Sequence, residues 1–117
     1  MKLLKIQNKK DLKEKFLYYL LMEPNLEGYR KEIEEIDEEI LLLIARRNKI
    51  SEKVAMVKKI ENLPITNVIR EKAILNKLKK KNYINEAHVE IIWDAIFVVS
   101  KDIQKEVFKP GYFFLSD

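Results

Sequence analysis

The sequence has 117 residues, of which 47% are hydrophobic and 36% are charged, and its formal net charge is +4. The length suits one domain, and the mixture of apolar and charged residues suits amphipathic helices rather than a disordered tail. Because the chain contains no cysteine, disulfides, thiolate catalysis and cysteine-bound zinc are excluded. The modest positive charge is compatible with two kinds of partner, nucleic acid and a small anionic substrate.

Residues 1–24 form a segment that ends at Pro24. Within it, Leu12 and Phe16 recur at helical spacing, which predicts a short amphipathic helix of unknown role. Lysines interrupt the first residues too early for the apolar stretch of a signal peptide, and no segment has the ~18 uninterrupted apolar residues of a membrane span. We therefore expect a soluble, cytoplasmic protein that does not contact a membrane.

Residues 26–62 carry the strongest pattern in the sequence and predict one long helix. Nine positions, here called the seam, alternate in steps of four and three as in a coiled coil: Tyr29, Ile33, Ile36, Ile40, Leu43, Arg47, Ile50, Val54 and Val57. Such a helix spans roughly 50 Å at 1.5 Å per residue, too long for the two shorter helices that follow to cover. A second copy of the chain is the simplest cover for its far end.

Two shorter helices are expected after the long one. Leu63-Pro64 ends the long helix, because the residue before a proline disfavours the helical conformation. Asn67 is a suitable N-cap for a second helix to about Lys81, and Asn85 for a third helix to about Phe108. The sequence therefore predicts an all-α subunit of three helices at residues 25–109, with an N-terminal extension (1–24) and an aromatic C-terminal tail (110–117).

Arg47 occupies a seam position that normally holds an apolar residue. Burying an arginine without a partner costs several kcal/mol, so an anion is expected beside it. Lys58 lies eleven residues later and points the same way, roughly 16 Å along the helix axis. The two long side chains can converge on one small ligand; the alternative is a solvated helix face with snorkelling side chains.

Arg30 lies seventeen residues before Arg47, roughly 25 Å away along the same helix. One chain cannot bring both onto a small ligand, so Arg30 takes part only if it comes from the partner in an antiparallel dimer. Its alternative role is a surface ion pair with Glu34, four residues later.

Four further polar residues have simple structural explanations when each is taken alone. Arg70 and Glu71 lie in the first turn of the second helix, where a glutamate favours the helix dipole. Ser100 and Gln104 share one face of the third helix, which is equally expected of its solvent side.

Taken together, these residues resemble the all-helical chorismate mutases. The resemblance covers about residues 26–108 and rests on several motifs in the family's order: residues 29–37, 43–47, 54–58, 63–65, 70–71 and 100–104. It implies an intertwined antiparallel homodimer that converts chorismate to prephenate in phenylalanine and tyrosine biosynthesis. This pericyclic reaction requires no cofactor or metal.

The resemblance also implies a role for each candidate site residue. Arg47 and the partner's Arg30 are expected to bind the two carboxylates of chorismate, with support from Arg70 and Ser100. Lys58 and Gln104 are expected to donate to the ether oxygen, where negative charge develops.

Two further positions complete the expected substrate site. Glu71 is expected to accept the ring hydroxyl. Asn67 stands where the family commonly has aspartate. Either residue can serve as an N-cap, but asparagine makes recognition of the substrate hydroxyl at this position less secure.

Alternative functions are retained. Isochorismate-pyruvate lyases share the fold and much of the cationic pocket. A basic helical module that binds nucleic acid through Lys79, Lys80 and Lys81 is the alternative from another class, although it leaves Arg47 and Gln104 unexplained. Mutases of this family are often fused to, or complexed with, neighbouring enzymes, so the two chain ends are candidate docking segments for a pathway-enzyme partner.

Overall fold

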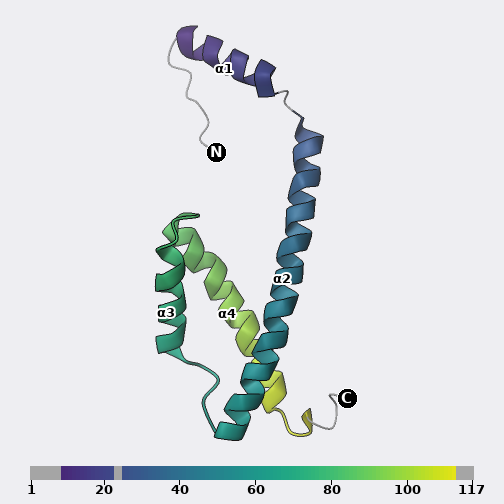
Figure 1. The fold of residues 1–117 in the computed structure, drawn as a ribbon, viewed down its shortest axis with the longest axis vertical. Coiled ribbons are helices and arrows are strands. Elements are labelled where there is room, and N and C mark those ends of the chain that lie inside the picture. Colours follow the sequence, from purple (N-terminus) through teal and green to yellow (C-terminus); the bar gives the residue numbers. More distant parts are fainter. Residues whose placement is uncertain (1–8, 23–24, 113–117) are drawn as a thin grey trace. The chain divides into compact units, whose positions relative to one another are not determined.

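The computed structural model describes residues 9–22 and 25–112. All regular structure in these residues is helical, as predicted: α1 (Lys9–Met22), α2 (Leu26–Glu61), α3 (Val68–Lys79) and α4 (Glu86–Phe108) (Figure 1). None of these described helices combines the length and the apolar character that a bilayer span requires. Most of the predicted aromatic tail, residues 113–117, lies outside the described part of the chain.

The helix ends lie close to their predicted positions because the sequence carries local capping signals. The Asn67 side chain accepts a hydrogen bond from the Arg70 backbone N–H at 3.0 Å, and Asn85 accepts one from Ala87 N–H at 2.8 Å, which confirms both predicted N-caps. At the end of α2, Asn62 adopts the left-handed conformation, with φ 58°. Asparagine tolerates this conformation and so ends helices much as glycine does.

Contacts within the chain define two units, Met1–Ile40 and Leu41–Asp117. The first contains α1 and the beginning of α2. The second contains the rest of α2, together with α3 and α4. The second unit holds every residue of the pocket described below.

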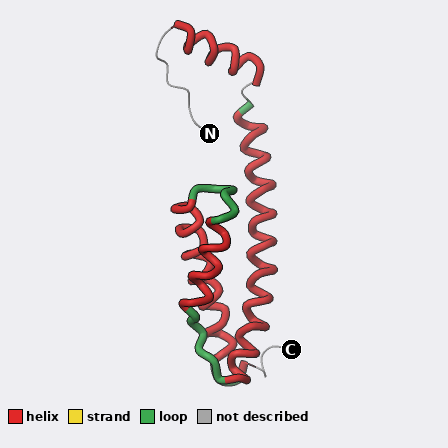
Figure 2. The backbone as a smooth tube through the Cα atoms, turned by 60° about the vertical axis from the view of Figure 1, so that its left-hand side comes forward, coloured by secondary structure: helices red, strands yellow, loops and turns green. Residues whose placement is uncertain are grey.

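Within the second unit, α3 and α4 lie side by side and α4 crosses the C-terminal part of α2 (Figure 2). An ion pair between Lys79 and Glu90 joins α3 to α4, and the Lys59 ammonium donates to the Val107 carbonyl at 3.0 Å, joining α2 to α4. The buried apolar side chains of the described residues are few: Ala55, Val89, Phe97 and Val107.

The apolar residues of the seam are largely exposed among the residues that the structure describes. Its eight apolar members are between 41% and 61% exposed, whereas Arg47, the ninth, is half-buried. Exposing so many large apolar side chains is unfavourable at about 25 cal/mol per Å² of apolar surface. In the described part of the chain, α2 thus carries an exposed apolar stripe, and few apolar side chains are buried.

Candidate active site

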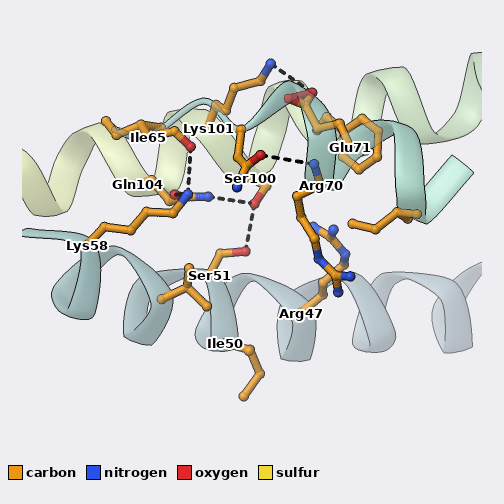
Figure 3. Close-up of a pocket in the computed structure, with 14 residues that line it drawn as sticks. Arg47, Ile50, Ser51, Lys58, Ile65, Arg70, Glu71, Ser100, Lys101 and Gln104 are labelled. Carbon is orange, nitrogen blue, oxygen red and sulfur yellow. Dashed lines mark hydrogen bonds and ion pairs between the residues drawn. The ribbon is translucent and has the colours of Figure 1, made fainter. Parts of the chain in front are cut away.

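A pocket of about 270 Å³ lies among α2, the loop after it, α3 and α4 (Figure 3). Its lining residues recur at helical spacing on each helix, so each helix turns one face to the same space. α2 contributes Arg47, Ile50, Ser51, Val54 and Lys58; the loop contributes Ile65 and Asn67; α3 contributes Arg70, Glu71 and Ile74; α4 contributes Phe97, Ser100, Lys101 and Gln104.

Seven of the eight predicted substrate-binding residues line this one pocket. They come from positions as far apart in the sequence as Arg47 and Gln104, which are 57 residues apart. Arg47 and Lys58 both line the pocket, as expected of two residues that share one face of α2. The exception is Arg30, an exposed residue of α2 that does not line the pocket. Its delivery by a second chain stays a prediction.

Lys58 is held by two hydrogen bonds at one end of the pocket. Its ammonium donates to the Ile65 carbonyl at 2.7 Å and to Gln104 Oε1 at 2.8 Å. A lysine ammonium has three donors. One N–H of Lys58 is therefore left for a ligand, beside the amide of Gln104.

Partial burial sets the protonation equilibrium of Lys58. Desolvation lowers its pKa below the usual 10.5, because removal from water disfavours the charged form, and the nearby Glu71 carboxylate opposes this change. The pocket therefore holds a cation that loses its proton more readily than an ordinary surface lysine does.

Ser100 and Gln104 face inward, so their interpretation as the solvent side of the third helix is wrong. Both are buried, at 7% and 6% exposed, and Gln104 Nε2 donates to Ser100 Oγ at 3.2 Å. Ser100 Oγ in turn lies 2.8 Å from the buried Ser51 Oγ on α2. The apolar neighbour Val99 is 41% exposed instead.

The pocket carries an excess of positive charge. Its ionisable lining residues are Arg47, Lys58, Arg70 and Lys101 against the single carboxylate of Glu71, which gives four positive charges minus one, or +3. Among the described residues, the guanidinium groups of Arg47 and Arg70 make no hydrogen bond or ion pair. Two unpaired guanidinium groups beside a small cavity are suited to bidentate contacts with carboxylates.

Glu71 and Asn67 are already engaged within the chain. Lys101 Nζ donates to Glu71 Oε1 at 3.2 Å, and the Asn67 oxygen accepts the Arg70 N–H as an N-cap. The carboxylate of Glu71 keeps its second oxygen for a ligand hydroxyl. In residues 9–22 and 25–112, no group of three or more His, Asp or Glu side chains is placed to hold a metal ion.

Sequence reasoning missed Ser51, Lys101 and the carbonyl of Ile65 as parts of the site. Ser51 follows Arg47 by four residues and precedes Lys58 by seven, so helical spacing places it on their face. Lys101 follows Ser100 directly, and only the structure shows that it turns to Glu71. A carbonyl in the loop after Pro64 carries no signal in the sequence.

These residues agree with a comparison to known families. The family described as chorismate mutase type II matches residues 29–105, well over half of the chain. The chain belongs to this family. The matched region contains all eight predicted site residues, the whole of α3 and all but the last three residues of α4.

Individual relatives support the same assignment. A chorismate mutase of Methanocaldococcus jannaschii is 36% identical over 80 residues, which cover 66% of this chain and 81% of that protein. A bifunctional chorismate mutase/prephenate dehydratase of Buchnera aphidicola is 35% identical over 86 residues, 71% of this chain but 22% of the relative. One of the same description from Aquifex aeolicus is 42% identical over 57 residues, 49% of this chain and 16% of the relative.

The chain thus spans about a fifth of the bifunctional relatives' length and most of the length of the archaeal mutase. No solved structure gives a significant match.

The charge excess in the pocket predicts that Arg47 does not stabilise the ligand-free protein. Replacing Arg47 with alanine relieves repulsion with Arg70, which lines the same pocket, and places a better helix former in α2. We expect the Tm of the ligand-free variant to equal or exceed that of the wild type. The rise in wild-type Tm between low salt and 0.5 M NaCl should be smaller in the variant, because salt screens the same repulsion.

Arg46→Ala is the matched control for this measurement. Arg46 directly precedes Arg47 in α2, is exposed and does not line the pocket. Its Tm should keep the salt dependence of the wild type. A fall of more than about 5 °C for Arg47→Ala, near 1 kcal/mol for a domain of this size, would contradict the repulsion argument.

Proposed function

We propose that this chain catalyses the rearrangement of chorismate to prephenate, because its relatives are named as chorismate mutases. One observation carries the proposal beyond family membership. Lys58 and Gln104 lie side by side at the end of a pocket with an excess positive charge of three, and each keeps a free N–H. This arrangement suits a substrate that carries two carboxylates and an ether oxygen.

The chemistry follows from where charge develops. In the rearrangement, the bond between the ring carbon and the ether oxygen breaks as a new carbon–carbon bond forms, and negative charge gathers on the oxygen. Lys58 donates to that oxygen with its third N–H, and Gln104 with the N–H of Nε2 that Ser100 does not use. Because both donors are already held in place, they stabilise the charge without reorganising during the reaction.

The remaining cations hold the substrate in its reactive shape. Arg47 and Arg70 bind carboxylates, and Ser100 donates to one of them. The free oxygen of Glu71 accepts the ring hydroxyl. These contacts fix both ends of chorismate and bring its two reacting carbons together. Part of the rate enhancement then comes from this orientation of the substrate.

The exposed seam supports a homodimer that completes the pocket. Arg47, Ile50 and Val54 belong to the seam and also line the pocket, so whatever covers the seam lies next to the bound substrate. A second α2, antiparallel to the first, covers an apolar stripe with an apolar stripe. It brings its own Arg30 to the open side of the pocket as a further carboxylate ligand.

Two other expectations stay predictions. The cytoplasmic location rests on the sequence alone. A pathway-enzyme partner is supported by the names of the two bifunctional relatives, which combine a mutase with a prephenate dehydratase.

The decisive test is loss of the ultraviolet absorbance of chorismate with purified protein, with the product identified as prephenate. Arg47→Ala should lower kcat/KM by at least about 100-fold, as expected for loss of a cationic ligand in a polar site. Arg46→Ala, the matched control, should stay within about twofold of the wild type.

Each rival function has its own result in the same assay. Turnover of isochorismate to pyruvate in place of chorismate would identify the lyase. Binding of nucleic acid that weakens steeply with salt, without turnover of either compound, would favour the basic module. The pairing of Lys79 with Glu90 argues against a free basic patch at that position.

The lowered pKa of Lys58 predicts the pH profile of the reaction. Activity requires the charged ammonium and is lost as pH rises through that pKa, so the alkaline limb of kcat/KM should lie below pH 10.5. Bound carboxylates raise the pKa again, so the limb of kcat should lie at higher pH. Lys58→Arg keeps its charge throughout and should remove the limb; a limb unchanged in this variant would assign it to another group.

Mixing two inactive variants tests the delivery of Arg30 across a dimer. Arg30→Ala and Arg47→Ala should each be inactive alone. After joint unfolding and refolding, mixed dimers regain one intact pocket of two, so roughly a quarter of wild-type activity should return from an equal mixture. No recovery, with mixed dimers verified by differently tagged chains, would show that Arg30 does not act from the partner.

A further inference from the structure

Ser51 lies in the pocket wall and makes a buried side-chain hydrogen bond that the proposed mechanism does not use. Its Oγ lies 2.8 Å from Ser100 Oγ, and both serines are nearly inaccessible, at 6% and 7% exposed. Figure 3 shows Ser51 rising from α2 toward Ser100 and Gln104 on α4. Either hydroxyl can donate in such a pair, and the direction matters because each has one proton.

The neighbouring bonds fix one of the contacts that Ser100 Oγ makes. A lysine ammonium only donates, so the Gln104 atom that faces Lys58 at 2.8 Å is the oxygen. The amide nitrogen of Gln104 therefore faces Ser100 and donates to its Oγ at 3.2 Å. Ser100 Oγ thus already accepts one hydrogen bond, and it has one remaining lone pair and one proton.

Two arrangements remain for the serine pair. In the first, Ser51 donates to Ser100, and the Ser100 proton is available to an acceptor in the pocket. In the second, Ser100 donates to Ser51, which donates to the carbonyl one turn back in α2, that of Arg47, as helical serines commonly do. The second arrangement leaves Ser100 with no proton for a ligand.

We propose that Ser51 is a positioning residue that donates to Ser100 and thereby directs the Ser100 proton to a substrate carboxylate. The inference rests on the proposed function, because it assigns the acceptor to the substrate. Ser51 itself does not touch the substrate. Ser51 and Gln104 both donate to Ser100 Oγ and occupy its two lone pairs. Only the Ser100 proton is then left to point into the pocket.

Three substitutions of Ser51 separate the hydrogen bond from the volume of the side chain. Ser51→Ala removes the donor. Ser51→Cys keeps the shape but is a weak donor, and Ser51→Thr keeps the hydroxyl. The carboxylate contact is made in the ground state and the transition state alike, so Ala and Cys should raise KM for chorismate by about 3- to 10-fold with kcat within about twofold. Thr should restore KM to near the wild-type value.

A double-mutant cycle with Ser100→Ala completes the test. If Ser51 acts through Ser100, Ser51→Ala adds no further rise in KM in the Ser100→Ala background. An equal rise in both backgrounds, a Cys variant that matches the wild type, or a loss of kcat that follows a loss of Tm would overturn the inference. If the wild type does not turn over chorismate, the proposed function and this inference are both wrong. If the wild type is active and Ser51→Ala leaves KM unchanged, only the inference is wrong.

Discussion

The second unit depends on one constraint, which is that the polar side chains buried or partly buried between α2 and α4 must find partners there. Two bonds between side chains of these helices meet it: Ser51 to Ser100, and Lys58 to Gln104. An unpaired buried polar group costs about 1–3 kcal/mol, so these contacts are expensive to lose. Their members are two turns apart on α2 and about one turn apart on α4, and a slide of one helical turn, about 5.4 Å, separates both pairs at once. The same two bonds that select this register also orient the donors of the pocket. The four apolar side chains that are buried among the described residues supply little further specificity of their own.

The electrostatics of the pocket act in the opposite direction. The pocket is lined by Arg47, Arg70 and Lys58, and its one carboxylate is that of Glu71. This carboxylate already forms an ion pair with Lys101. Without a bound anion, a site of this kind lowers the stability of the folded chain. Desolvation by burial adds to this, because it lowers the pKa of Lys58, although the Glu71 carboxylate opposes the change. A dianionic ligand neutralises most of the excess and binds only the folded form, so it returns stability by mass action. Such a site illustrates the usual opposition between stability and function.

Sequence alone predicted the parts of this molecule that depend on local signals. Asn67 and Asn85 cap helices because their side chains reach backbone N–H groups two or three residues away. Arg47 and Lys58 share a face because helical periodicity fixes that relation. Which way α4 turns depends on contacts with α2, far away in sequence, and Ser100 fits a solvent face as well as a buried one. Ser51 was overlooked for the same reason, since a serine within an amphipathic helix is ordinary until its partner on another helix is known.

The overlap of seam and pocket links assembly to chemistry. Ile50 and Val54 are about half exposed, yet they form part of the pocket wall, so in the single chain this wall is open to water. Water there screens Arg47 and Lys58 and weakens each contact with an anion. Burying the seam in the proposed dimer removes that water and lowers the local dielectric, which strengthens every donor already in place. In the same proposed dimer, the partner's Arg30 is expected to add a positive charge beside the substrate. On this argument the apolar stripe of α2 stabilises the fold and excludes water from the reaction by one and the same contact, and a substitution that weakens the seam far from the pocket reduces catalysis without touching the substrate.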